Sequence, residues 1–151
     1  MIVSNSTTLI ILNDLKRLDL LENIFSRLYI PKKVYEEVCI RGCEFPAFIQ
    51  VKEIQKDELY SFLCKVLDEG ESEAITLAKQ LSMPLIIDEK KGRKIAKNLG
   101  IQIIGFLGVL YMNCQKDFVS KQEIENILDE AIKKGYRISQ QLIETFLASL
   151  Q

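Results

Sequence analysis

The sequence predicts an α/β protein, a three-layer α/β/α sandwich with a central parallel sheet. Short apolar segments such as 84–87 and 101–104 alternate with longer segments whose apolar residues recur at helical spacing. Strands that are apolar along their whole length are typical of parallel sheets with helices on both faces. The 151 residues suit one domain, so we expect 1–151 to form a single domain with C-terminal helices 121–150 packed on it.

The elements follow from apolar periodicity and from residues that favour helix ends. Ser6 and Thr7 suit the cap of a first helix, Pro31 suits the first turn of another, and Gly100 suits a helix end. We expect strands at 1–4, 28–30, 49–54 (an edge strand), 84–87 and 101–104. We expect helices from 8 onward and at 19–25, 31–40, 57–67, 70–81, 91–99, 106–114, 121–134 and 139–150, with a loop at 42–46.

Composition limits the classes of function. Apolar residues make up 48% of the chain and charged residues 27%, the balance of a soluble globular protein. The net charge of −1 argues against a strongly basic nucleic-acid binder but allows an acidic metal site beside a local basic patch. No apolar run approaches the ~20 residues of a membrane span, and no signal peptide is evident, so we expect a cytoplasmic protein. The spacing of the cysteines fits no zinc or disulfide framework, which favours reduced thiols at Cys39, Cys43, Cys64 and Cys114.

Four acidic or acid-like residues are the candidate site: Asn5, Glu37, Glu71 and Asp88. Asn5 and Asp88 each follow a predicted strand, and ligands of parallel sheets bind beyond the carboxyl ends of strands. A carboxylate that faces a core costs several kcal/mol unless it is paired or binds a cation. The chain has no His, so a metal here would have mainly oxygen ligands, which suit Mg²⁺ or Mn²⁺.

Helical geometry selects two of these acids. Glu71 extends an apolar stripe that continues through Ala74 and Ile75, whereas Glu73 lies about 200° around the helix from Glu71. We therefore prefer Glu71 as a ligand and keep Glu73 as the alternative. Another possibility is that Glu71 is only an acid in a first helical turn, where the helix dipole favours it.

Simple structural roles also compete for the other acids. Glu37 flanks the stripe of Val34 and Val38, but it could instead be a boundary residue paired with Lys33. Asp88 could cap the helix that follows it, and the adjacent Glu89 could substitute for it in either role.

A basic cluster follows Asp88 directly and could hold a nucleic-acid backbone beside the acids. No aromatic residue interleaves this cluster, so a solvated helix face is the alternative. Its members are Lys90, Lys91, Arg93, Lys94 and Lys97. Other motifs are missing: the first strand leads into Asn-Ser-Thr-Thr rather than a glycine-rich phosphate loop, and a chain without His has no Ser-His-Asp triad.

Taken together, these segments resemble the PIN-domain family over roughly residues 1–110. The opening I-V-S-N-S-T-T-L-I is similar to the first PIN strand and turn, where most members carry Asp at the position of Asn5. The segment I-P-K-K-V-Y-E-E-V resembles the helix with the second acid, which falls on Glu37. The segment G-E-S-E-A-I-T-L-A-K matches the third acid to Glu71, with Glu73 as the alternative, and P-L-I-I-D-E-K-K-G-R-K-I-A matches the fourth to Asp88.

The resemblance is closest to an uncharacterised branch that is similar to toxins of VapBC toxin–antitoxin pairs. It implies Mg²⁺- or Mn²⁺-dependent RNA cleavage, homodimerisation and a small antitoxin partner. Asn5 departs from the family pattern, because an amide oxygen can ligate a cation but brings no negative charge. A non-catalytic module that binds RNA or protein, and a structural α/β protein whose acids are caps, remain the alternatives.

Overall fold

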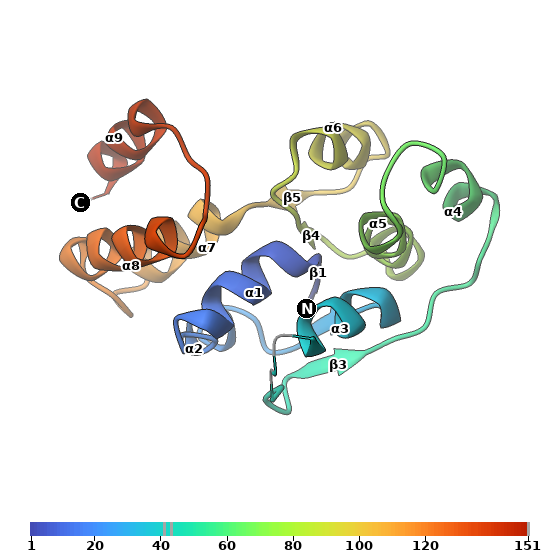
Figure 1. Ribbon diagram of the computed structural model, residues 1–151, viewed down its shortest axis with the longest axis horizontal. Coiled ribbons are helices and arrows are strands. Elements are labelled where there is room, and N and C mark those ends of the chain that lie inside the picture. Colours follow the sequence, from blue (N-terminus) through green and yellow to red (C-terminus); the bar gives the residue numbers. More distant parts are fainter. Residues whose placement is uncertain (41, 43, 151) are drawn as a thin grey trace.

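The computed structural model describes residues 1–40, 42 and 44–150, and within them five strands form one parallel sheet (Figure 1). The strand order is β3-β2-β1-β4-β5, and Val3 in the central strand lies opposite both Tyr29 and Leu85. The predicted α/β/α sandwich with a central parallel sheet is confirmed. The strands are β1 (Ile2–Ser4), β2 (Leu28–Ile30), β3 (Ile49–Val51), β4 (Leu85–Ile86) and β5 (Ile103–Ile104).

Helices cover the sheet and extend the molecule at one end. Helix α3 packs against α1 and α5, α5 lies against β1 and β4, and α7 contacts α2, α8 and β5. In Figure 1, α8 and α9 lie at the end of the molecule opposite α4. The helices are α1 (Ser6–Asp14), α2 (Asp19–Glu22), α3 (Lys32–Cys39), α4 (Glu58–Leu63), α5 (Glu69–Leu81), α6 (Lys90–Asn98), α7 (Phe106–Gln115), α8 (Lys121–Lys133) and α9 (Gln140–Ser149).

Most expected elements are present, but several boundaries differ. Helix α4 ends at Leu63 rather than 67, β3 ends at Val51 rather than 54, and α2 is shorter than predicted. The expectation that Ser6 or Thr7 caps the first helix is wrong, because Asn5 occupies the N-cap position of α1. The backbone N–H of Asn5 donates to the Ile86 carbonyl in the neighbouring strand, which moves the start of the helix toward the sheet.

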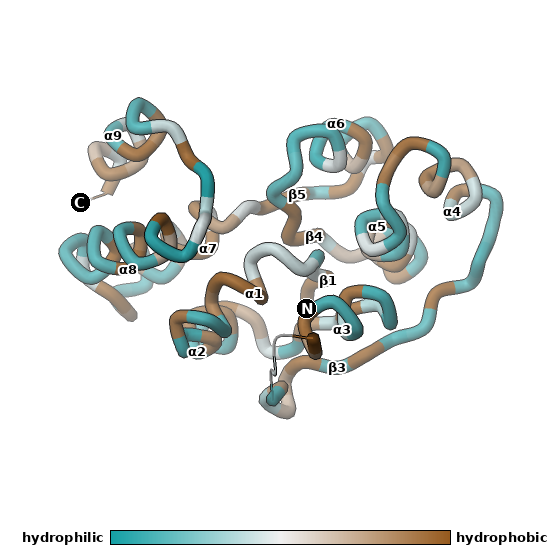
Figure 2. The backbone as a smooth tube through the Cα atoms, viewed as in Figure 1, coloured by the Kyte–Doolittle hydropathy of each residue, from teal (hydrophilic) through white to brown (hydrophobic). Residues whose placement is uncertain are grey.

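The core is continuous from the sheet to the C-terminal helices. Ile124 of α8, Phe146 of α9 and Leu150 are buried in the same cluster as Val3 and Leu85. Figure 2 shows hydrophobic residues along the central strands and mostly hydrophilic residues on α6 and α8. Among the described residues, no helix is both long and apolar enough to cross a bilayer.

The cysteines agree with the expected thiol state where the structure describes them. Cys39, Cys64 and Cys114 are free. Cys43, and with it part of the predicted loop at 42–46, lies outside the described residues.

Candidate functional site

Asn5 and Asp88 follow the strands β1 and β4, whereas Glu37 lies in α3 and Glu71 in the first turn of α5. Asn5 follows β1 directly and is 4% exposed. Its side chain makes no capping bond to α1, although its backbone occupies the cap position. The amide is therefore buried at the strand end and is not used to hold the helix start.

The Glu37 carboxylate packs against the first turn of α5. A Cβ on Gly70 would overlap Glu37 Oε1, so a side chain at this position would have to displace the Glu37 carboxylate. Glu37 Oε1 is buried and has no hydrogen-bond partner in the described part of the chain. Burial raises the pKa of Glu37, and the charge of Asp68 raises it further. The proposed surface pair with Lys33 is not formed, since the Lys33 Nζ lies 3.9 Å from Glu36 Oε2 instead.

Glu71 lies beside Glu37 and is 9% exposed. Burial, followed by the charges of Asp68 and Glu89, raises the pKa of Glu71 from 4.5 to about 7, and Glu37 adds a smaller effect. An acid that merely complements a helix dipole has its charged form stabilised, which would lower its pKa. The opposite shift argues against a simple first-turn role for Glu71.

Glu73 and Asp68 have structural roles next to these two acids. Glu73 Oε1 accepts a hydrogen bond of 3.0 Å from the backbone N–H of Lys33, in the first turn of α3. Asp68 caps α5 by accepting from the Glu71 N–H at 2.8 Å. Glu73 thus ties α5 to α3, whereas no hydrogen bond of this kind occupies the Glu71 carboxylate.

Asp88 is held by two hydrogen bonds from other elements. Thr8 Oγ1 in α1 donates to Asp88 Oδ2 at 2.9 Å, and the Phe106 N–H at the start of α7 donates to Asp88 Oδ1 at 3.0 Å. The alternative that Asp88 caps the helix immediately following it is wrong, because Glu89 occupies the N-cap position of α6. Asp88 instead accepts a hydrogen bond at the start of α7, because the pairing of β4 with β5 brings Gly105 and Phe106 alongside it.

The four candidates are only partly brought together. Glu37 and Glu71 are neighbours, with Glu89 close enough to affect Glu71 electrostatically, while Asp88 is bonded to Thr8 and Phe106. In residues 1–40, 42 and 44–150, no group of three or more His, Cys, Asp or Glu side chains lies close enough to hold a metal ion. The ligand roles of Asn5, Glu37, Glu71 and Asp88 stay predictions.

The basic cluster divides into two parts. Lys90, Lys91, Lys94 and Lys97 are exposed along α6. Arg93 turns inward, and its Nη1 donates to the Ile87 carbonyl at 2.8 Å. Arg93 therefore anchors α6 to the end of β4 near Asp88, and the four lysines are the members of the cluster that are free to meet a polyanion from solvent.

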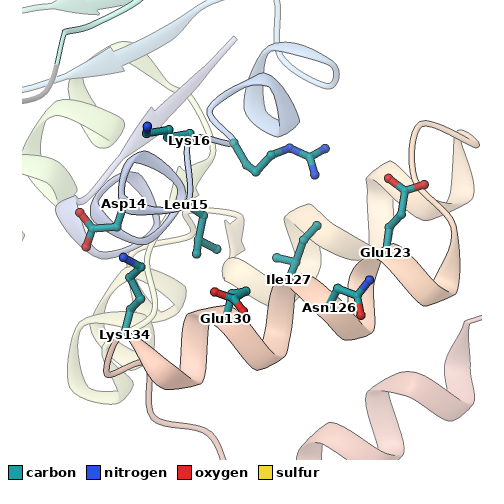
Figure 3. A pocket seen from close by; sticks show the side chains of 9 residues that line it. Asp14, Leu15, Lys16, Glu123, Asn126, Ile127, Glu130 and Lys134 are labelled. Atoms are coloured by element: carbon teal, nitrogen blue, oxygen red, sulfur yellow. The ribbon is translucent and has the colours of Figure 1, made fainter.

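Three cavities lie on the Asp88 side of the molecule or next to it. One of about 450 Å³ separates the end of α1 from α8, and the side chains of Asp14 and Lys134 point toward one another at its edge (Figure 3). Two others, of about 420 and 700 Å³, both have Asp88 in their walls. Their linings include Tyr136 and Arg137, which follow α8.

Comparison with known proteins agrees with this fold. A PIN-domain family model matches residues 1–151. A PilT N-terminus domain protein from the hyperthermophilic archaeon Sulfolobus solfataricus is similar in structure, with a TM-score of 0.51 and 19% identity. That match covers 92% of this chain and 100% of the other. The sequence has no significant match among curated proteins.

The chain belongs to the PIN-domain family. PIN domains are generally nucleases that use divalent metal ions, so the fold places this protein among nuclease-like modules that act on nucleic acid.

Some residues of the site were not anticipated from the sequence. The pattern Asp68-Glu69-Gly70-Glu71 contained a signal for Asp68 and Gly70. A capping residue followed by a glycine marks a helix start that a neighbouring element can approach closely. Tyr136 and Arg137 had no local signal, because only the tertiary fold brings them to Asp88.

The contact between Gly70 and Glu37 can be tested by a double-mutant cycle. We expect Gly70→Ala to destabilise the wild type by about 1–3 kcal/mol, because the added methyl overpacks the contact. In a Glu37→Ala background the same change should be neutral or stabilising by up to about 1 kcal/mol, since alanine favours helix. Urea unfolding of the four proteins gives the values. Equal costs in both backgrounds would contradict the contact.

The raised pKa of Glu71 predicts how stability depends on pH. The unfolded chain loses this proton near pH 4.5 and the folded chain near pH 7. The contribution of Glu71 to the free energy of unfolding is therefore fully present below pH 4.5, and it is lost as pH rises through about 7.

Urea unfolding across this window should show the wild type losing stability with rising pH, and Glu71→Gln losing less. Glu36→Gln, on the exposed face of α3, is the control and should follow the wild type. Identical pH profiles for wild type and Glu71→Gln would refute the raised pKa.

Proposed function

We propose that this protein is a Mg²⁺- or Mn²⁺-dependent endoribonuclease that hydrolyses phosphodiester bonds in RNA. The observation that carries the proposal is the Glu37 carboxylate, whose buried Oε1 has no hydrogen-bond partner among the described residues and whose charge acts on the buried Glu71. A buried, unpaired carboxylate oxygen beside a second carboxylate is unfavourable without a cation. A family of metal-dependent nucleases supplies the context for that cation.

The donor set fits a hard divalent ion. Glu37, Glu71 and Asp88 offer carboxylate oxygens and Asn5 an amide oxygen, and oxygen ligands suit Mg²⁺ or Mn²⁺. Each Asp88 oxygen accepts one hydrogen bond, from Thr8 or from Phe106. A carboxylate has about four acceptor positions, so Asp88 keeps capacity for a ligand while its orientation is fixed.

The chemistry follows from these placements. A divalent cation held here supplies a bound water of lowered pKa and neutralises charge on the phosphate. Glu37 and Glu71 provide the negative charge that attracts the cation, and the two bonds to Asp88 prevent its carboxylate from rotating away. Asn5 lies at the end of β1, next to Ser6 and Thr7, where these polar groups can orient the attacking water or the scissile phosphate.

The biological setting is a further part of the proposal. The resemblance of the segments around Asn5, Glu37, Glu71 and Asp88 to VapBC-type toxins supports a toxin of a type II toxin–antitoxin pair. In that setting the chain acts in the cytoplasm as a homodimer, RNA is its substrate, and a small antitoxin protein is its partner. The exposed lysines of α6 would contact the RNA backbone.

Asn5 favours a second candidate, a non-catalytic PIN module that binds RNA or a protein partner. An amide in place of a carboxylate removes one negative charge from the cation site. Asp88 is bonded to Thr8 and Phe106 rather than to the other candidate residues, which agrees with a weaker cation site. Metal-dependent turnover discriminates the two candidates.

The test is cleavage of a panel of RNAs in Mn²⁺ by the wild type, Asp88→Asn, Glu37→Gln and Glu36→Gln. Loss of a ligand should lower the rate by about 100-fold or more, since even outer partners of metal ligands change activity 10–100-fold. Glu36→Gln should match the wild type, because Glu36 is exposed on the same helix. Cleavage that survives Asp88→Asn and Glu37→Gln, or that needs no metal, would exclude the proposed site.

The departure at Asn5 gives a gain-of-function prediction. We expect Asn5→Asp to bind Mn²⁺ more tightly and to cleave RNA faster, because the new carboxylate adds charge and an acceptor for the attacking water. The metal-free variant should be less stable than the wild type, since it adds a like charge to a buried site. Side-by-side cleavage and thermal melts with and without Mn²⁺ check both effects. Equal, robust cleavage by both proteins would show that the amide suffices.

A further inference from the structure

Two cavities meet at Asp88 and share three residues in their walls. Asp88, Tyr136 and Arg137 line both the cavity of about 420 Å³ and the cavity of about 700 Å³. An extended ligand that occupied both cavities would therefore pass the Asp88 carboxylate and the Arg137 side chain. Cavities of these sizes are within the range of small-molecule and ligand sites in proteins.

The two cavities differ in chemistry. The smaller one is lined by charged residues of both signs, the cations Lys90, Lys134 and Arg137 and the acids Asp14, Asp88 and Glu89. The larger one is lined mainly by apolar side chains, with Arg93 and Arg137 among its few charged residues. Its apolar residues are Ile103, Ile104, Leu107, Ile138 and Leu142. Arg137 lines both cavities and offers a cation for an anionic phosphate, and the apolar chamber suits a flat base, so together they suit a nucleotide.

The segment that supplies Tyr136 and Arg137 is held in place. The Tyr136 ring packs edge-on against Phe106 with centroids 4.9 Å apart, and the Tyr136 N–H donates to the Ala131 carbonyl. At the end of α8, Lys134 points toward Asp14 of α1 (Figure 3). Burial and the charge of Asp88 raise the pKa of Tyr136 to about 12, so its hydroxyl stays protonated beside that carboxylate.

We propose that the connection between α8 and α9 forms a nucleotide subsite for the RNA substrate. Arg137 pairs with the phosphate of one nucleotide, and the apolar chamber between β5 and α9 receives its base. Tyr136 is a positioning residue that holds Arg137 beside Asp88. This subsite rests on the proposed ribonuclease function and adds to it the residues that seat a base next to the acidic site.

The phosphate contact is tested with a single-stranded RNA oligonucleotide and the full chain. Arg137→Gln should weaken RNA binding about tenfold at low salt. It should also reduce the slope of log affinity against log salt concentration by about one, the equivalent of one counterion. Arg27→Gln is the matched control, because Arg27 is exposed just before β2 and lines neither cavity. The control should leave both values unchanged.

The base contact is tested with oligonucleotides that carry one abasic position each. For the wild type, one position should show about a tenfold loss of affinity, the size expected when a stacked base is removed. Leu142 is 49% exposed, so Leu142→Glu should fold normally and should abolish that position dependence by placing a charge in the chamber. Circular dichroism and melting temperature confirm that each variant is folded.

The outcomes separate the two proposals. If the wild type binds and cleaves RNA but Arg137→Gln behaves like Arg27→Gln, the subsite is wrong and the ribonuclease function stands. If no abasic position matters for the wild type, the base chamber is wrong. If the wild type neither binds nor cleaves RNA, the proposed function fails and the subsite fails with it.

Discussion

The close contact of α3 with α5 is the constraint on which the site depends. Gly70 allows the Glu37 carboxylate to reach the first turn of α5, where Glu71 is already buried. Burial raises the pKa of both acids, and the charge of Glu37 adds a smaller rise at Glu71. The hydrogen bond from Lys33 to Glu73 holds the two helices together on the flank and keeps the repulsion between the acids from separating them.

The other half of the site is organised by hydrogen bonds and is less affected by desolvation. Asp88 receives one bond from α1 and one from α7, so its orientation depends on helices that belong to different parts of the chain. Arg93 reinforces this region through the Ile87 carbonyl. This region therefore combines Glu37 and Glu71, whose pKa values are raised, with an Asp88 that is bonded separately to Thr8 and Phe106.

Sequence reasoning predicted the parts of this arrangement that depend on local periodicity. The parallel sheet followed from apolar runs. Helical geometry favoured Glu71 over Glu73 as a ligand, and that choice stays a prediction, although Glu73 accepts a hydrogen bond from Lys33. The failures have a common cause, which is that bonds between distant segments leave no local pattern. The capping of α7 by Asp88 depends on the pairing of β4 with β5, and the inward turn of Arg93 depends on the end of β4.

The bond between Thr8 and Asp88 spans 80 positions of the chain, and the Tyr136 that packs on Phe106 comes later still. During synthesis on the ribosome, the N-terminal strand and α1 emerge long before their partners exist. Contacts between such distant segments form late in folding, because the chain entropy of closing long loops opposes them. A growing chain thus carries Asn5 and Glu37 from early on, but the surroundings of Asp88 are assembled only when the chain through Tyr136 has left the ribosome.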